Sequence, residues 1–347
     1  MAVHQRNRVI RHVLAVCAAL TICAAAPVAS AQPPSDPPAE YDKLSQEAAK
    51  ADEDLLKARD DLDNRNAELA AANADLTAAT TAQEQAAGGV EQARVEADRI
   101  TAVSFQSGAT SSRMSAVLLS GSAQDFMERM SALAVLANDQ NRVINALKAA
   151  SARADQARAD AQGARERATT AREGAARLVG EIQRNKATLN ARISQVRQAL
   201  QRLSPATKIS MGTVKDTGPY LGPVGAANTA LQAALAKRGS AYEWGAEGPS
   251  EFDCSGLMMW AYKAAGISLP HSSRSQYTLG RSVAQNELQP GDLVFYDDGS
   301  GNPAAIHHVG MYVGAGKMVD APTEGQVVDV RSIRGDGHYI GARRLVG

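Results

Sequence analysis

A seven-residue hydrophobic repeat runs through much of the 347-residue chain and limits what it can fold into. Mostly apolar residues return every seven positions over residues 41–97, with a second row offset by three. The repeat fails over residues 105–124 and resumes over residues 133–203. A spacing of seven with an offset of three is typical of the two buried positions of a coiled coil. The sequence therefore predicts two long helices.

The break between the two runs indicates how these helices pair. Helices joined by one irregular segment can bury their apolar rows by folding back on each other. We therefore expect residues 41–203 to form an all-α antiparallel coiled-coil hairpin, an arm that at 1.5 Å per residue reaches on the order of 100 Å. A single long helix that dimerises with another chain is the alternative, because a heptad does not specify its partner.

The placement of aromatic residues indicates a second, compact domain at the C-terminal end. Both tryptophans and every tyrosine except Tyr41 lie at or beyond Tyr220. Residues 204–225 are rich in Gly and Pro and form a predicted linker, so the second domain is expected over residues 226–347. The formal net charge of +0 gives no broad basic surface that would favour nucleic acid.

The N-terminus has the pattern of an export signal. Basic residues precede an apolar run over residues 13–26, and the small residues Ala29, Ser30 and Ala31 follow it. We expect residues 1–31 to be a signal peptide, residues 32–40 a Pro-rich lead, and the mature protein to be secreted. An uncleaved anchor is the alternative, although the run is shorter than the about 20 residues that a membrane span needs.

Removal of this signal would leave Cys254 as the one cysteine of the mature chain. An apolar run with helical spacing follows it and ends near Gly266, which places the thiol at a helix N-terminus. Unpaired N–H groups there favour an anion, so we expect the thiol pKa, ordinarily about 8.5, to be lowered. A small buried cysteine without a chemical role is the alternative for this residue alone.

Two predicted strands supply partners for this thiol. Residues 306–313 alternate as a strand, with His308 and His307 on opposite faces and Gly310 leaving open space beside His308. Residues 317–320 would form the next strand of a hairpin and bring Asp320 beside His308. A cysteine, a histidine and a third polar group are what thiol acyl transfer requires. Since the two histidines diverge, a zinc site is disfavoured and no metal is expected. Further strands are expected over residues 293–296, 327–331 and 339–345.

Several motifs in this region resemble one family. The sequences Tyr242-Glu243-Trp244-Gly245, Asp253-Cys254-Ser255-Gly256, Gln289-Pro290-Gly291-Asp292-Leu293 and His308-Val309-Gly310 are similar in type and order to those of the NlpC/P60 cell-wall peptidases. The resemblance covers residues 225–347 and extends to the coiled-coil, Rip-type wall hydrolases of actinobacteria. It implies an α+β papain-like domain with Cys254 as nucleophile, His308 as base and Asp320 as third member. It also implies supporting or substrate-binding roles for Tyr242, Asp253, Ser255, Ser273 and Arg274.

The same resemblance implies an activity and a cellular role. We expect a cell-wall-associated cysteine endopeptidase that needs no cofactor and hydrolyses peptidoglycan stem peptides during wall remodelling and cell division. The implied bond lies between D-glutamate and the following diamino acid. A thiol amidase or acyltransferase on the same fold is one alternative. A non-catalytic coiled-coil scaffold for other wall hydrolases is the other.

The irregular segment between the two helical runs suggests how such an enzyme is controlled. Residues 118–126 are similar to the coil region of division-associated wall hydrolases and their activators. We therefore expect the arm tip, residues 105–130, to dock on a membrane division complex of the FtsE–FtsX type. We also hypothesise that the arm, or the 204–225 segment, covers the Cys254 groove until the tip engages that partner.

Overall fold

The structure is a computed structural model that describes residues 36–106, 115, 121–334 and 337–346. The predicted signal peptide, part of the Pro-rich lead and much of the arm tip lie outside these residues. The chain divides into two units, Met1–Asp36 and Pro37–Gly347, and the long helices and the sheet belong to the second. Within the described ranges, no helix combines the length and the apolar character that a membrane span requires.

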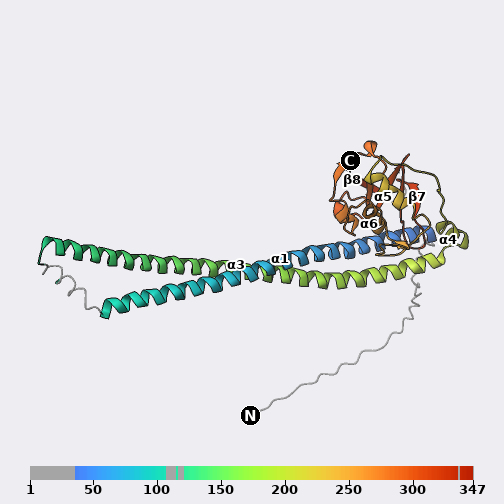
Figure 1. Cartoon of the computed structure of the whole chain (residues 1–347). Coiled ribbons are helices and arrows are strands. Elements are labelled where there is room, and N and C mark those ends of the chain that lie inside the picture. Colours follow the sequence, from blue (N-terminus) through green and yellow to red (C-terminus); the bar gives the residue numbers. More distant parts are fainter. Residues whose placement is uncertain (1–35, 107–114, 116–120, 335–336, 347) are drawn as a thin grey trace, which may run out of the picture. The chain divides into compact units, whose positions relative to one another are not determined.

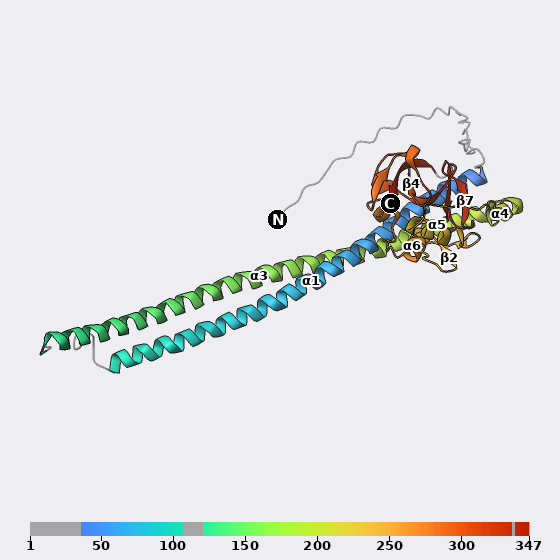
Figure 2. The ribbon, with the colours of Figure 1, turned by 45° about the horizontal axis from the view of Figure 1, so that its top comes forward.

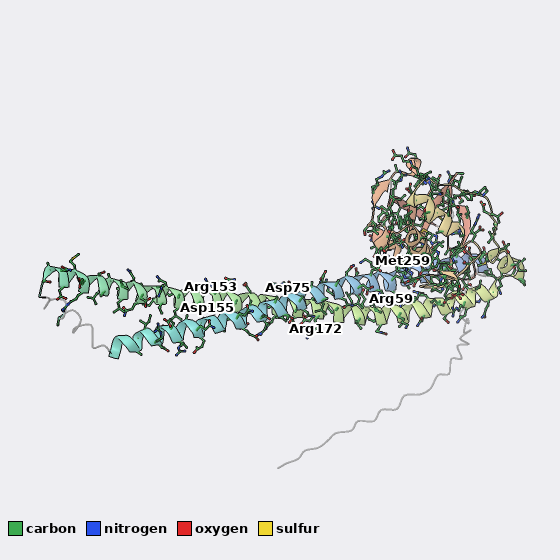
Figure 3. The ribbon with its side chains drawn as sticks, viewed as in Figure 1. Arg59, Asp75, Arg153, Asp155, Arg172 and Met259 are labelled. Atoms are coloured by element: carbon green, nitrogen blue, oxygen red, sulfur yellow. The ribbon has the colours of Figure 1, made fainter. Side chains whose placement is uncertain are left out.

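Two long helices, α1 (Pro37–Gln106) and α3 (Ala123–Arg202), form the predicted antiparallel hairpin and lie side by side in Figures 1 and 2. Most of the buried α3 residues follow the predicted seven-residue rows, and these include Ala154, Ala161, Ala168, Ala175, Leu189 and Val196. Charged side chains such as Asp75, Asp155 and Arg172 are exposed along the helices (Figure 3). The apolar rows of α1 and α3 pack against each other within one chain. The predicted hairpin is therefore confirmed, in preference to a single long helix that dimerises with another chain.

The ends of these helices differ slightly from the prediction. Helix α1 begins at Pro37, inside the predicted Pro-rich lead, because the first turn of a helix has N–H groups without helical partners and so tolerates proline. Helix α3 begins after Ser122, whose side chain accepts a hydrogen bond from the Asp125 N–H at 3.1 Å. Both helices therefore begin at residues that suit a helix N-terminus.

The C-terminal domain is built on a six-stranded antiparallel sheet with the order β3-β8-β4-β5-β6-β7. Its strands are β3 (Arg281–Val283), β4 (Leu293–Asp297), β5 (His308–Gly314), β6 (Lys317–Asp320), β7 (Asp329–Ser332) and β8 (His338–Arg344). Two further strands, β1 (Ala241–Tyr242) and β2 (Glu251–Phe252), pair in parallel. The five predicted strands are present, with ends that move by one or two residues.

Helices cover one face of this sheet and form the core. They are α5 (Ala226–Leu235), α6 (Cys254–Ala264) and the short α7 (Ser273–Gln276), and the 3-10 turns are η1 (Gln285–Glu287) and η2 (Pro303–Ala305). Leu257 and Met258 of α6 pack with Phe295 and Val309 of the sheet. Alternate strand residues form a smaller cluster that includes Tyr296, as expected when successive side chains point to opposite faces.

The predicted linker is packed against the sheet. Its first part is helix α4 (Pro205–Met211), which Ser204 caps. The backbone N–H groups of Lys215 and Asp216 donate to the carboxylate of Asp329 in β7, at 2.7 and 3.3 Å. Lys317 of β6 forms an ion pair with Asp216 at 2.7 Å. These contacts fix the segment beside β6 and β7.

The first turns of α1 join the core of the C-terminal domain. Tyr41, Ala48 and Leu55, which the heptad assigns to the helical seam, are at most 3% exposed and belong to the same buried cluster as Cys254. The Tyr41 hydroxyl donates to the Glu324 carbonyl at 2.5 Å. One face of the arm is therefore docked on the domain.

Candidate active site

The start of α6 fixes the position of Cys254. Asp253 is the N-cap residue, and its Oδ1 accepts hydrogen bonds from the Gly256 N–H at 2.6 Å and the Ser255 hydroxyl at 3.0 Å. A Cβ atom at Gly256 would lie 2.2 Å from the Ala246 carbonyl oxygen, so only glycine fits there. The Asp-Cys-Ser-Gly motif thus sets a capped helix start with the thiol in its first turn.

His308 and Asp320 meet across the β5–β6 pair. The Nε2 atom of His308 lies 2.6 Å from Asp320 Oδ2, and Arg331 Nε donates to Asp320 Oδ1 at 3.0 Å. Burial alone would raise the pKa of Asp320, but the charge of Arg331 and the bonds to His308 and Arg331 lower it to about 2. The ionised carboxylate accepts from Nε2–H, so proton exchange with a thiol falls to Nδ1.

Gly310 allows this close pairing. A Cβ atom there would lie 2.7 Å from Met318 Sδ and 3.2 Å from Asp320 Cβ. The prediction of open space beside His308 is therefore wrong, because β6 fills it. The glycine serves the close approach of Asp320 to the histidine strand.

The thiol lies next to the strand that carries His308. A backbone hydrogen bond from Val309, the residue after His308, favours the Cys254 thiolate. Tyr242 is also beside the thiol: burial, then the charges of Asp52 and Cys254, raise the pKa of its hydroxyl. Cys254 therefore lies near Tyr242 and next to the strand that carries the His308–Asp320 pair.

Helix α1 covers this site with two consecutive acidic residues. Asp52 is 4% exposed and Glu53 is 2% exposed, and Cys254 beneath them is 6% exposed. Burial, followed by the charges of Asp253 and Glu53, raises the pKa of the thiol well above its ordinary value. The prediction of a lowered thiol pKa is thus wrong for this closed form, because burial and nearby carboxylates outweigh the helix terminus.

His271 joins the site although sequence analysis gives it no role. Its Nε2 lies 2.8 Å from Asp253 Oδ2 and its Nδ1 lies 3.1 Å from Glu247 Oε1. Burial would lower the pKa of the imidazole, but the charge and hydrogen bond of Asp253, with Glu247, raise it to about 9. The ring is charged at neutral pH and balances the carboxylate beside the thiol. No spacing rule links it to Cys254, so only the fold shows it.

Comparison with known proteins agrees with this geometry. Residues 239–344 match the model of the NlpC/P60 family. These residues form an NlpC/P60 domain. A probable endopeptidase of Mycobacterium tuberculosis strain H37Rv is 45% identical over 130 residues, which cover 36% of this chain and 32% of that protein. The probable endopeptidase p60 of Listeria seeligeri is 46% identical over 102 residues, covering 29% and 19%.

Solved structures also match this part of the chain. The P60 domain of an antigen from M. avium subspecies paratuberculosis is 30% identical, with 35% of this chain and 96% of that chain covered and a TM-score of 0.32. The Resuscitation Promoting Factor Interacting protein RipA is 28% identical, with coverages of 40% and 77% and a TM-score of 0.31. The chain spans about a third or less of the curated relatives it matches.

Helix α7 holds two of the predicted substrate-binding residues of the NlpC/P60 domain, Ser273 and Arg274, against α1. Arg274 Nε donates to the Ile306 carbonyl at 2.9 Å, and its guanidinium also pairs with Asp54 of α1. Ser273 is fully buried, and its N–H donates to Glu53. Ser255 faces Asp253, so its observed contact supports the helix cap.

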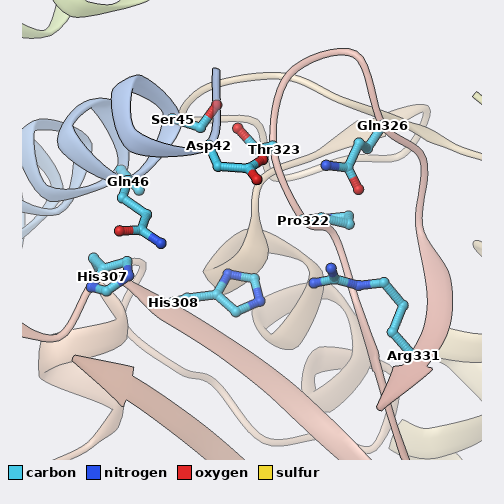
Figure 4. Close-up of a pocket in the computed structure, with 10 residues that line it drawn as sticks. Asp42, Ser45, Gln46, His307, His308, Pro322, Thr323, Gln326 and Arg331 are labelled. Carbon is cyan, nitrogen blue, oxygen red and sulfur yellow. The ribbon is translucent and has the colours of Figure 1, made fainter. Parts of the chain in front are cut away.

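A cavity of about 190 Å³ remains between α1 and the histidine side of the NlpC/P60 domain. Figure 4 shows Ser45 and Gln46 of α1 on one side, with His308 and the guanidinium of Arg331 on the other. The space between α1 and the NlpC/P60 domain is therefore closed over Cys254 and partly open beside His308.

Of the described histidines, His307 lies next to His308 in the chain and is buried as well. His307 is 4% exposed, and burial, with the charge of His308, lowers its pKa to about 4. Its Nδ1 lies 3.3 Å from the Ala305 carbonyl oxygen. Within the described residues, no three His, Cys, Asp or Glu side chains are grouped to hold a metal ion.

Proposed function

We propose that this protein is a secreted, wall-associated cysteine endopeptidase that cleaves peptidoglycan stem peptides in wall remodelling and cell division. One observation carries the proposal. Its support is an NlpC/P60 domain, shared with relatives named probable endopeptidases, in which a capped helix-start cysteine lies next to the strand of a histidine that pairs with an ionised aspartate. Thiol, base and orienting carboxylate are the three groups of a cysteine peptidase.

The geometry supports a two-step mechanism. His308 Nδ1 takes the proton of the Cys254 thiol, and the thiolate attacks the amide carbonyl carbon. Backbone N–H groups at the start of α6 stabilise the oxyanion. The C–N bond breaks, His308 returns the proton to the leaving amine, and water then hydrolyses the thioester. Asp320 holds the ring and balances its positive charge.

The bond between D-glutamate and the following diamino acid is the proposed target, by similarity to the family. A thiol amidase or acyltransferase would use the same groups, because the triad fixes the chemistry and not the acceptor. Digestion of purified peptidoglycan by residues 225–347, followed by mass spectrometry of the products, tests the target. Cys254→Ala is the control, and equal digestion by this folded variant would refute the cysteine mechanism.

The docked arm supports a regulatory extension of this proposal. With α1 over Cys254, a stem peptide has no path to the thiol, so the described form is proposed to be inactive. The arm tip would engage a membrane partner of the FtsE–FtsX type and release the cleft. To move the protein from 1% to 99% open, a partner must favour the open form by about 5.5 kcal/mol.

The full mature chain, residues 32–347, should therefore digest peptidoglycan more slowly than residues 225–347 at equal concentration. Equal rates would assign the arm to positioning alone and leave the peptidase proposal intact.

A further inference from the structure

One buried carboxyl at the contact between the arm and the NlpC/P60 domain lacks a hydrogen-bond donor. Asp52 of α1 is 4% exposed, and its Oδ1 has no hydrogen-bond partner among the described residues. A carboxylate that is taken out of water without hydrogen bonds is costly, whereas the protonated group carries no charge and costs much less. The docked position of α1 therefore penalises the charge of Asp52.

The two other buried carboxyls beside it are supplied with donors. Glu53 accepts a hydrogen bond from the Ser272 hydroxyl at 2.8 Å, and Asp253 accepts one from the Gly256 N–H at 2.6 Å. Hydrogen bonds of this kind favour the ionised form of a carboxyl group. Of these three groups, Asp52 is therefore the one whose charge the docked form supports least.

The charges around Asp52 do not compensate for its burial. Burial raises its pKa first, and the charges of Asp253 and Glu53 raise it further. The positive charges of His271 and Arg59 oppose this rise, but Arg59 is exposed and His271 already pairs with Asp253 at 2.8 Å. The titratable groups whose charges act on Asp52, or feel its charge, are Glu53 and Arg59 of α1, Asp253 and Cys254 at the start of α6, Tyr242 of β1 and His271 before α7.

We propose that Asp52 is a proton-operated switch in the arm: a proton on its carboxyl stabilises the docked α1, and loss of that proton weakens docking. The inference deepens the proposed regulation by the arm and rests on it, but it does not depend on peptide hydrolysis. The arm would be released more easily in neutral than in acidic surroundings, even with the same membrane partner.

The direction of the pH effect follows from the two environments of Asp52. In the open form water surrounds the carboxyl, which then has its ordinary pKa of 3.8, whereas burial raises the pKa in the closed form. The stabilisation of the closed form is therefore complete below about pH 3.8 and is lost as the pH rises through the closed-form pKa. Between these two values, the open-to-closed ratio rises by up to about tenfold per pH unit.

Backbone N–H groups that bond to α1 report whether the arm is docked. Those of His271 and Ser272 donate to the carboxylate of Asp60 at 3.2 and 3.1 Å. Their hydrogen exchange is measured by mass spectrometry between pH 4 and pH 7 in the Cys254→Ala form of residues 32–347, so that the thiol does not titrate. Each rate is divided by the intrinsic rate at the same pH. This corrected rate should rise by about tenfold or more over the range.

Two substitutions of Asp52 test the assignment. In the same Cys254→Ala chain, Asp52→Asn has a similar size and cannot ionise. It should remove most of the pH dependence and lower the corrected rate at pH 7 by about tenfold or more. Asp52→Ala should also remove most of the dependence, whatever its absolute rate. Asp61→Asn is the matched control, because Asp61 lies on the same helix, is half-buried and pairs with Lys57. It should keep the pH dependence of the parent chain.

The same data contain the results that would overturn the switch. One is a corrected rate without pH dependence in the parent chain, and another is an unchanged dependence in Asp52→Asn. The N–H groups of β4, which pair with β5 and β8, should stay protected throughout. Exchange in β4 in step with His271 and Ser272 would also overturn the switch, because the pH would then act on unfolding of the whole domain.

Digestion of peptidoglycan by the mature chain with Cys254 intact separates this inference from the peptidase proposal. Exchange that depends on pH through Asp52, in a protein that digests no peptidoglycan, would support the switch and refute the peptidase proposal. Digestion together with exchange that does not depend on pH would overturn the switch and leave the peptidase proposal intact.

Discussion

Replacing Asp320 with Asn should separate the charge of this residue from its shape. The environment lowers the pKa of the carboxyl from 3.8 to about 2, and at about 1.4 kcal/mol per pH unit the charged form gains about 2–3 kcal/mol on folding. Because the folded-state pKa is the lower one, this stability is complete above pH 4. It is lost as the pH falls through about 2.

Urea unfolding of the wild type and of Asp320→Asn at several pH values measures this contribution. The difference in unfolding free energy should narrow by about 1 kcal/mol between pH 7 and pH 3, since about half of the charge contribution remains at pH 3. Turnover at pH 7 should fall by about 10²-fold without being abolished, because the amide holds the ring but supplies no charge. A stability gap that is independent of pH would refute the electrostatic argument.

Asp292→Asn is the matched control for this experiment. Its carboxylate also binds an arginine, Arg344, at 2.7 Å from both Nε and a terminal nitrogen, but it lies before β4 and has no contact with His308 among the described hydrogen bonds. We expect it to lower stability and to leave turnover near the wild-type value. A comparable loss of turnover would show that Asp320 acts through the fold and not on the imidazole.

Three further substitutions test the histidines. His308→Ala should reduce hydrolysis nearly as much as Cys254→Ala, whereas His307→Ala should be mild, and equal losses would show that the catalytic strand is misassigned. His271→Gln should lower stability by about 3 kcal/mol at pH 6 and by little above pH 9. The sign follows because the folded-state pKa of about 9 exceeds the ordinary 6.5, so the contribution is complete below pH 6.5 and is lost as the pH rises through 9. A loss of equal size at both pH values would assign His271 to packing alone.

The long helices could be predicted because their signal repeats over many turns. A row such as Ala154, Ala161 and Ala168 is buried in the structure as its spacing requires. Strands β1 and β2 could not be predicted, because a strand of two residues is too short to show an alternation of apolar and polar residues. The packing of the predicted linker could not be predicted from the sequence either, because its Gly and Pro content does not indicate the contacts of Asp216 or Asp329.

The candidate site likewise contains residues that could be predicted from the sequence and residues that could not. Cys254, His308 and Asp320 could be proposed because their residue types and motif order carry chemical information. Asp52 and Glu53 could not, because acidic residues on a long helix normally face solvent, and only the docked fold shows these two to be buried. The sequence suggests that something covers the groove, while the structure identifies α1 as the cover and leaves the 204–225 segment beside β6 and β7.

The positions of Asp52 and Glu53 imply that the docked helix would suppress the proposed peptidase in two ways. It blocks the groove, and it keeps Cys254 protonated through burial and through carboxylate charge. In the proposed open form both effects end together, because water reaches the thiol and two negative charges leave it. The Val309 hydrogen bond and the start of α6 then remain as the groups that favour the thiolate. The movement that admits a substrate would therefore also favour the Cys254 thiolate. One conformational change would control both substrate access and thiol reactivity.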